Sequence, residues 1–533
     1  MKALLEPIKE IARFDELFRD LKKGTAGVTG ISGGLGSQKA HMIAGLSEDA
    51  PVRLLIAENE LKAKELYDDY RLYDAETLYY PAKDLIFYQA DIHGNLLIRQ
   101  RLQVIQALLE RKEVTIITSV GGCMDFLLPL DVFEKHCIHL RNDSELDLDK
   151  IRKELVRLGY ESTFQVESTG QFSVRGGILD IYPLTEQNPI RIELWGDEID
   201  SIRSFDAESQ RSIENLEEIT IYPASELILT EDTIARGVKA IKKEAKAQST
   251  KFRDKMMTEE AARIRHAAEE ICDQIGEGEI LQGAGQYLHY FYPETVSFLE
   301  YLPENSRIFL DEPNRIIECA DALEAEFQES VSHRLEKGYL LPGQAKLMCS
   351  TAELVAKLNR RGCVAVSLME PQKGEWNIRD EFGVTVKSVN SYNNQFPLLV
   401  KDLKSWKKAG YRIVLASPSR TRAQHLAEDL QNEEIPAFYS ENEERVLKPG
   451  EIMLIHGAAR RGFEYPMQKF VLITETDIFG KEKKKNRKKS EYSGQKIQNF
   501  TDLSIGDYVV HESHGIGKYL GVETLDVGGI HKD

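Results

Sequence analysis

The 533-residue chain contains 42% hydrophobic and 29% charged residues, a composition typical of folded globular proteins and unlike that of disordered or membrane proteins. Its length suits about three to five domains. The formal net charge of −18 repels phosphate on average, which argues against a general nucleic-acid-binding protein and leaves only local basic patches for such contacts.

Neither the cysteines nor the amino terminus indicates an oxidising or membrane location. The cysteines are scattered without a CxxC pair, so we expect reduced thiols and no zinc site or disulfide framework. They are Cys123, Cys137, Cys272, Cys319, Cys349 and Cys363. The first residues, MKALLEPIKEIARF, carry charges where a signal peptide has its apolar stretch, and no run of about 18 apolar residues occurs. We therefore expect a cytoplasmic protein without a membrane partner.

Residues 1–123 alternate between strand-like and helix-like patterns. Val52–Ala57 and Val114–Thr118 are short apolar runs that suit buried parallel strands, and Asn95–Glu110 between them has helical periodicity. This alternation predicts an α/β sheet domain.

A segment near the start, GISGGLGSQKA, lies where a phosphate-binding loop of the form GxxxxGK[ST] would lie. Aligned on Lys39, the first glycine is Gly33, but Gln38 replaces the second glycine and Ala40 replaces the hydroxyl residue that holds magnesium. Gly36 can still form a turn at the helix terminus, where some anion affinity remains possible. We predict a degenerate loop that caps a helix and does not turn over ATP.

Residues 124–225 change to two-residue alternation, as in Ile190–Trp195, which is followed by a turn-like Gly-Asp pair. The segment contains no catalytic constellation. If Gln171–Ile178 forms a strand, Phe172 lies on one face and Arg175 on the other. An arginine on an open face is a common interface anchor.

Residues 226–378 return to the α/β pattern. Ile234–Ile275 is charged and almost free of Gly and Pro, which predicts a long helix or a helical pair. A strand-like run then leads to Asp311 and Glu312, which resemble the acidic motif that positions magnesium and water in helicase-type ATPases. Without a working phosphate loop these carboxylates have no nucleotide to serve; alternatively, Asp311 caps the next turn and Glu312 is solvated.

A second α/β unit follows, with Tyr411–Ala416 and Phe470–Thr474 as strands and Thr421–Asn432 as a helix. The next run, KEKKKNRKK, has seven basic residues in nine and predicts a flexible linker that is able to touch nucleic acid. In the last segment, His511 and His514 have a spacing that suits neither a helical pair nor a zinc triad, so we expect no metal there.

These patterns predict an α/β multidomain protein. The expected parts are a P-loop-like nucleotide-fold domain in two pieces (1–123 and 226–378), a small α+β insert (124–225), a small α/β domain (379–480), a basic linker (481–499) and the start of a small β-barrel (500–533).

Several segments together resemble the transcription-repair coupling factor family. Gly506–Ile530 is similar to the start of that family's RNA-polymerase-interacting domain, which CarD-type regulators share. Phe172–Pro183 and Ile190–Asp206 resemble the domain that the family shares with the excision-repair protein UvrB and uses to bind UvrA. The segment QYLHYFY at Gln286–Tyr292 also resembles the UvrB-like module.

The resemblance implies a scaffold that recruits UvrA to stalled RNA polymerase in transcription-coupled nucleotide excision repair. It implies UvrA contacts at Phe172 and Arg175. It also implies contacts with the polymerase β subunit, at Tyr519, Leu520, Val522 and Leu525. In the family an ATP-dependent motor on double-stranded DNA follows these domains. We therefore expect the chain to end inside the polymerase-binding domain, to use no cofactor itself, and to leave ATP, magnesium and most DNA contacts to that motor.

Two departures from related patterns matter. Gln38 and Ala40 separate the chain from UvrB, whose phosphate loop is intact, and Glu161 stands where the family often carries an arginine. The second departure weakens the expected electrostatic contact with UvrA. Two other functions remain open at this point: a UvrB-like helicase subunit, which needs ATP binding, and a CarD-like transcription regulator, which lacks UvrB-like domains.

Overall fold

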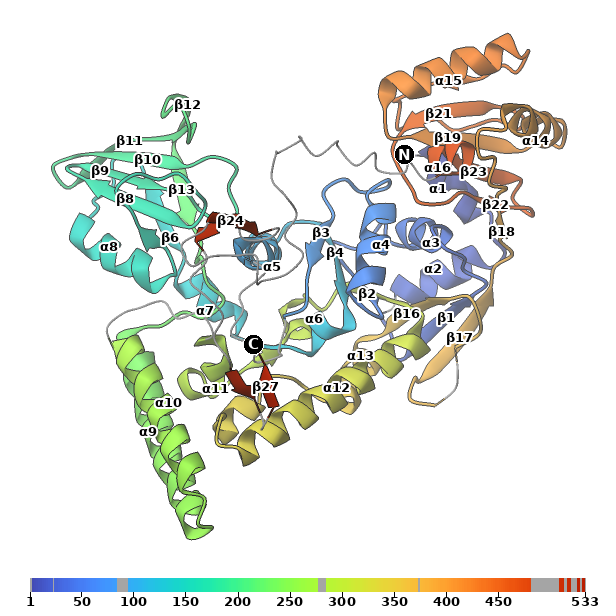
Figure 1. Cartoon of the computed structure of the whole chain (residues 1–533). Coiled ribbons are helices and arrows are strands. Elements are labelled where there is room, and N and C mark those ends of the chain that lie inside the picture. The colour runs from blue at the N-terminus through green and yellow to red at the C-terminus, as the bar shows by residue number, and fades with distance from the viewer. Residues whose placement is uncertain are drawn as a thin grey trace. The chain divides into compact units, whose positions relative to one another are not determined.

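The computed structural model forms two compact units, Met1–Gly480 and Lys481–Asp533, which are coloured along the chain in Figure 1. It describes residues 2–22, 24–83, 94–276, 284–371, 374–480, 508–511, 515–518, 525–527 and 530–532.

A seven-stranded sheet organises the first unit, and all its neighbouring strands run parallel. In spatial order it contains β17 (Ile378–Gly383), β1 (Val28–Ser32), β16 (Cys363–Ser367), β15 (Arg307–Asp311), β2 (Val52–Ala57), β4 (Val114–Ser119) and β3 (Leu78–Tyr80). Its central strands are the apolar runs of the sequence, because a parallel sheet covered on both faces has to be apolar on both.

Helices bury both faces of this sheet. Leu54 and Ile56 belong to one hydrophobic cluster, whereas Leu55 and Ala57 belong to another, as alternation along β2 requires. The helices of this layer are α1 (Lys2–Lys9), α2 (Phe14–Lys22), α3 (Gln38–Leu46), α4 (Glu60–Tyr70), α5 (Gly94–Leu109), α6 (Val120–Met124), α12 (Pro313–Glu336) and α13 (Thr351–Arg361). The expected α/β sheet domain is confirmed.

An insert leaves the sheet after β4 and returns at β15, which lies beside β2. Its main part is a six-stranded sheet in the order β12 (Ser212–Leu216), β11 (Glu198–Phe205), β10 (Ile190–Trp195), β9 (Ile178–Ile181), β8 (Gln171–Arg175) and β7 (Glu161–Ser162). It also contains α7 (Leu130–Lys135), α8 (Leu148–Arg157) and the antiparallel pair β6 (Ile138–Arg141) and β13 (Glu218–Ile221).

The remaining elements before the second sheet are helical or short. A helical pair, α9 (Glu231–Asp254) and α10 (Thr258–Gly276), confirms the long helical pattern of the sequence. The shorter elements are the 3-10 helices η1 (Ala284–Tyr287), η2 (Phe298–Tyr301) and η3 (Pro342–Ala345), the helix α11 (Leu288–Phe291), and β5 (Phe126–Leu127) paired with β14 (Val296–Ser297).

A smaller α/β layer closes the first unit. Its sheet runs in the order β18 (Lys387–Ser388), β22 (Phe463–Tyr465), β23 (Phe470–Thr474), β19 (Arg412–Ser417), β21 (Ile452–His456) and β20 (Phe438–Tyr439), with helices α14 (Phe396–Lys408), α15 (Arg420–Asn432) and α16 (Glu475–Phe479). The boundary expected between 378 and 379 falls at the start of β17, which pairs with β1 in the larger sheet.

The second unit is described only as two antiparallel hairpins, β24 (Tyr508–His511) with β25 (Gly515–Lys518) and β26 (Leu525–Val527) with β27 (Ile530–Lys532). The expected linker, 481–499, lies outside the described residues. All six cysteines are free thiols. Within the described ranges, no helix is long and apolar enough to cross a membrane.

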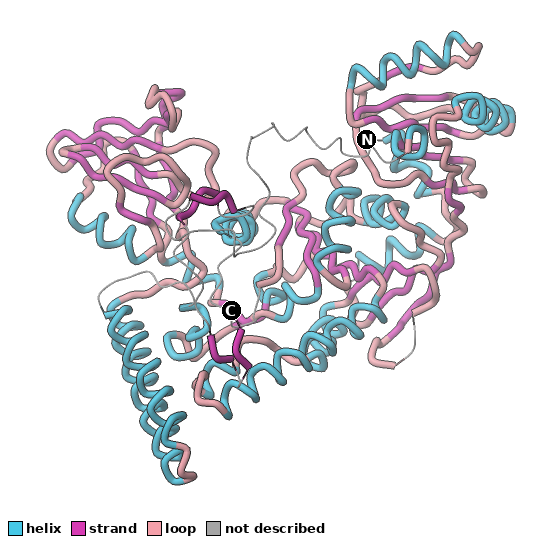
Figure 2. Tube along the Cα trace, viewed as in Figure 1, coloured by secondary structure: helices cyan, strands magenta, loops and turns pink. Residues whose placement is uncertain are grey.

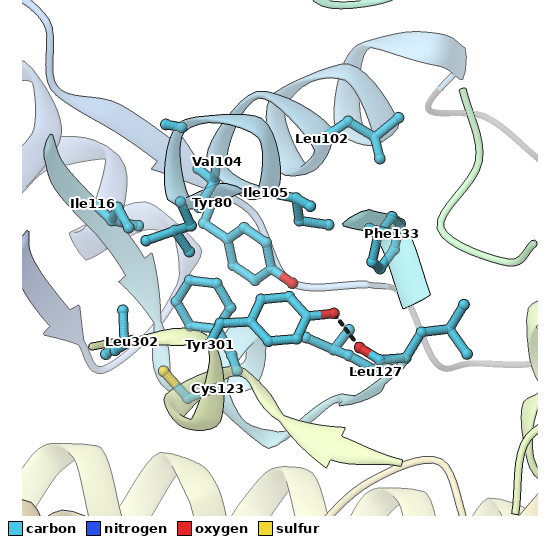
Figure 3. Packing of buried hydrophobic residues seen from close by; sticks show 14 of the residues in the cluster. Tyr80, Leu102, Val104, Ile105, Ile116, Cys123, Leu127, Phe133, Tyr301 and Leu302 are labelled. Carbon is cyan, nitrogen blue, oxygen red and sulfur yellow. Dashed lines mark hydrogen bonds between the residues drawn. The ribbon is translucent and has the colours of Figure 1, made fainter. Parts of the chain in front are cut away.

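A buried arginine joins the two ends of the insert. Arg101 on α5 bonds to the Asp125 carboxylate (Nη1–Oδ2 3.1 Å) and to the Glu226 carboxylate (Nε–Oε1 2.8 Å). Its guanidinium lies 4.2 Å from the centroid of the Tyr80 ring. Figure 3 shows the packing around this point, where Tyr80 and Tyr301 lie in the same hydrophobic core.

The charges of this cluster depend on one another. Burial raises the pKa of Asp125. Burial also acts to raise the pKa of Glu226, but the Arg101 guanidinium and Lys83 outweigh it and hold that pKa below its ordinary value. Arg101 has a raised pKa, because the two carboxylates and Tyr80 outweigh the effect of burial. Among the described residues, removal of Arg101 therefore leaves buried Asp125 without an ion-pair partner and leaves Glu226 with Lys83 alone.

We expect Arg101→Met to lower the free energy of unfolding of the first unit by about 3–5 kcal/mol, as is usual when one partner of a buried ion pair is lost. Denaturant unfolding at pH 7 measures this. Lys135→Met, which removes an exposed pair with Asp131, serves as control and should cost no more than about 1 kcal/mol. Equal losses in the two variants would contradict a structural role for Arg101.

Candidate functional sites

The segment that the sequence predicts to be a degenerate phosphate loop connects β1 to α3. Gly33 has a φ of 89°, and a Cβ there would lie 2.1 Å from the Val384 carbonyl oxygen, so only glycine fits. Gly36 also adopts a left-handed φ of 50° and forms the turn before the helix. The Ser37 side chain makes no capping bond to α3.

Lys39 already has two anionic partners inside the protein. Its ammonium lies 2.7 Å from Asp311 Oδ1 and 2.5 Å from Glu312 Oε1. Burial acts to lower the pKa of Lys39, but the two carboxylates outweigh burial and the pKa is raised. A phosphate would have to displace these carboxylates and meet their negative charge.

Asp311 and Glu312 therefore have a role that neither sequence interpretation foresaw. Glu312 itself occupies the N-cap position of α12, with a left-handed φ of 59° and no side-chain capping bond, so the alternative in which Asp311 caps the turn is wrong. Its carboxylate also accepts a hydrogen bond from the Leu368 amide at 2.9 Å. The two acids neutralise Lys39.

The opposite side of α3 is covered by the smaller sheet. Gln38, which replaces the loop glycine, donates to the Tyr465 hydroxyl at 2.7 Å and accepts from the Leu35 amide at 3.0 Å. His41 lies between that hydroxyl, at 3.1 Å, and the Leu4 carbonyl oxygen, at 2.7 Å. Gln38, which stands at the position of a phosphate-loop glycine, thus joins two layers of the unit through its bond to Tyr465.

The loop region offers little to a metal or nucleotide. Ala40 is buried and has no hydroxyl for magnesium. Among the described residues, no group of three or more His, Cys, Asp or Glu side chains is arranged to hold a metal ion. The chemistry that this arrangement supports is internal charge neutralisation.

We expect isothermal titration of the protein with Mg-ATP to show no micromolar site, because Lys39 is occupied and two loop residues are replaced. Lys62→Ala, which changes an exposed lysine on α4, is the matched control. A micromolar site that survives Lys62→Ala and disappears in Lys39→Ala would show that the loop binds nucleotide.

His41 makes the stability of this contact depend on pH. Burial lowers the pKa of His41 to about 4 from an ordinary 6.5, so between these values the unfolded chain binds a proton that the folded chain does not. His41 consequently removes up to about 1.4 kcal/mol of stability for each unit that the pH falls within that window.

The variant His41→Phe isolates this contribution, because the lost hydrogen bonds cost the same at every pH. The unfolding free energy of the wild type minus that of the variant should fall by about 3 kcal/mol from pH 6.5 to pH 4, because only the wild type loses stability through His41. Denaturant titrations at several pH values measure it. A difference that is constant with pH would mean that His41 is protonated in the folded protein.

The second candidate site lies on the six-stranded sheet. Sequence alternation predicts one strand across Gln171–Ile178, but the structure turns at Gly176 and Gly177, and β8 and β9 form a hairpin. The prediction of a continuous strand is wrong because Gly176 adopts a φ of 61°, which reverses the chain where the apolar alternation continues. Arg175 thereby comes to lie at the end of the sheet, beside the turn.

Phe172 and Arg175 lie on opposite sides of β8. Phe172 is fully buried in the core of the insert, so it supports the surface from beneath. The Arg175 side chain is 38% exposed and bonds to Asp180 at 2.9 Å. Arg191 holds the same carboxylate through two bonds, of 2.6 and 2.9 Å, which raise the pKa of Arg191.

Two exposed aromatic residues near this hairpin were not predicted from the sequence. Phe164 is 83% exposed, and the Arg175 guanidinium lies 5.7 Å from its ring centroid. Trp195 is 84% exposed at the end of β10, whose Leu194 amide bonds to the Gly177 carbonyl oxygen. The sequence signal that could have indicated their exposure is that Phe164 lies within a loop segment and Trp195 lies directly before one.

The expected polymerase-binding residues have no described side chains. Tyr519, Leu520 and Val522 lie outside the described residues, and Leu525 is described only as the first backbone position of β26. Their role stays a prediction.

Comparisons with known proteins agree with this organisation. Residues 138–227 match the family model described as the UvrB interaction domain, and residues 503–533 match the CarD-like/TRCF RID domain. The chain is 34% identical to the transcription-repair-coupling factor of Bacillus subtilis (strain 168), over 99% of this chain and 44% of that protein. It is 31% identical to that of Staphylococcus aureus (strain Mu50 / ATCC 700699), over 100% of this chain and 45% of the relative.

The fold is a parallel α/β sheet domain interrupted by a segment that matches the UvrB interaction domain. More narrowly, the chain is similar along its whole length to transcription-repair-coupling factors, and it spans a little under half the length of the curated relatives that it matches.

Proposed function

We propose that this chain is a binding scaffold of transcription-coupled DNA repair, in which the insert binds UvrA and residues 500–533 contribute to binding of the RNA polymerase β subunit. The observation that carries the proposal is the contact of Arg175 with exposed Phe164, with exposed Trp195 at the end of β10, on the domain that matches the UvrB interaction domain. Exposed Arg and aromatic side chains are the usual anchors of protein interfaces.

The parallel sheet then acts as a support. Its loop is a relic of a phosphate loop, because the glycine geometry persists while Lys39 is neutralised internally. The final hairpins are the beginning of a small β-barrel that the polymerase subunit recognises, a proposal supported by the match at 503–533. We assign ATP, magnesium and movement on double-stranded DNA to the part of the relatives that this chain does not span.

Two alternative functions, a UvrB-like helicase subunit and a CarD-like regulator, each fit fewer of the observations than the proposed scaffold does. An active UvrB-like helicase subunit needs a loop open to nucleotide, whereas Lys39 is bonded to Asp311 and Glu312. A CarD-like regulator accounts for 503–533 but not for the interaction domain at 138–227.

We expect Arg175→Ala to weaken UvrA binding by about 1–4 kcal/mol while leaving the melting temperature nearly unchanged. Stability is preserved because Asp180 keeps both bonds from Arg191. Phe164→Ala should also weaken binding, since its ring is exposed beside Arg175. Binding is measured by titration calorimetry with purified UvrA.

Arg152→Ala, an exposed arginine on α8 of the same domain, is the matched control and should bind normally. Phe172→Ala should lower stability by about 3–5 kcal/mol, because it empties a fully buried site. Full UvrA affinity in a well-folded Arg175→Ala protein would refute the proposed anchor.

A further inference from the structure

Helix α9 carries a basic face in a chain whose net charge is −18. It packs antiparallel against α10, and the two helices lie side by side in Figures 1 and 2. Its buried face consists of small or apolar residues at regular helical spacing. These are Thr233, Gly237, Ile241, Ala245 and Ser249.

The basic side chains gather on the other face. With 3.6 residues per turn, six of them fall within an arc of about 120° around the helix axis. All six are exposed: Arg236, Lys239, Lys242, Lys243, Lys246 and Arg253. Between Thr233 and Arg253 the helix has one acidic residue, Glu244, which lies outside this arc and accepts hydrogen bonds from the Tyr290 hydroxyl and the Gly343 amide. Two acids, Asp232 and Asp254, fall within the arc at its two ends, so the arc carries six cations and two carboxylates.

Among the described residues, these cations have no carboxylate partners. No ion pair joins any of the six to an acidic side chain in the part of the chain that the structure describes. On α10, by contrast, Arg265 pairs with Glu269 four residues away. Lys239, Lys243 and Lys246 instead repeat the same charge at spacings of three and four, which destabilises a helix.

The residues that surround the cations indicate whether this face suits a protein or a nucleic acid. Between Arg236 and Arg253 the arc contains only Thr250 besides the cations, and the small residues Ala235 and Ala247 lie next to it. A protein interface normally has aromatic or large apolar anchors at its centre, which this face lacks. The phosphate backbone of a nucleic acid needs only regularly placed cations.

We propose that this face of α9 binds the phosphate backbone of duplex DNA without regard to sequence. Arg236 and Arg253 are 17 residues apart, so the face extends about 26 Å, or about seven to eight base pairs along a duplex. This contact is independent of the UvrA surface, since it uses a different element. It also differs from contacts that a motor elsewhere in the relatives would make.

The test compares the full chain with the variant Lys239→Gln/Lys243→Gln/Lys246→Gln. Fluorescence anisotropy with a 30-base-pair duplex of mixed sequence measures affinity at several salt concentrations. The variant should bind at least tenfold more weakly in about 0.1 M salt. The slope of log affinity against log salt should decrease by about two to three, since each phosphate contact contributes about 0.9.

Lys401→Gln/Lys404→Gln/Lys408→Gln on α14 is the matched control, because it removes three exposed lysines and the same charge. It should bind the duplex within about twofold of wild type. Circular dichroism confirms that both variants keep their helix content, since glutamine is a good helix former.

Three outcomes would overturn the proposal. An unchanged affinity in the α9 variant would assign DNA binding to another region, such as the basic run 481–489. Equal losses in the two variants would show a general charge effect. If the wild type fails to bind duplex at high micromolar concentration but binds poly-glutamate through the same lysines, the face is a site for an acidic protein surface instead.

Discussion

The first unit depends on the burial of one cation at the place where the chain enters and leaves its insert. A sheet domain can interrupt a parallel sheet only if its two connections return to neighbouring points, and those connections bring Asp125 and Glu226 into the apolar core. Arg101 makes both acceptable by bonding to each of them, and its guanidinium also lies over the buried Tyr80 ring. Because a lone buried charge is costly, the three groups have to be kept or lost together.

Lys39 shows the same principle, since it too is buried beside carboxylates of its own chain. A lysine in a working phosphate loop needs an external anion, whereas Lys39 is satisfied by two carboxylates of its own chain. Gln38 then uses the position of the missing glycine to reach Tyr465 in the smaller sheet. Gln38 thus supplies a bond that joins two layers of the unit.

The local sequence pattern predicted most helices and strands well, but it did not predict which distant residues contact one another. The apolar runs at Val52–Ala57 and Val114–Thr118 became central parallel strands, because both faces of such strands are buried. The hairpin turn at Gly176 was missed, since the alternation of β8 continues into β9. The pairing of Lys39 with Asp311 joins residues 272 positions apart, and no periodicity encodes a contact over that separation.

The bonds between α3 and the smaller sheet have a consequence for synthesis of the chain. Gln38 and its partner Tyr465 are 427 residues apart, and Ser37 and the Arg461 amide are 424 apart. At about 5–20 residues per second, a ribosome needs roughly 20–85 s to make the second partner after the first. During that interval α3 is complete, but the smaller sheet that covers it in the finished unit has not yet been made. The emerging chain therefore has to fold its first layer with one side of α3 still uncovered.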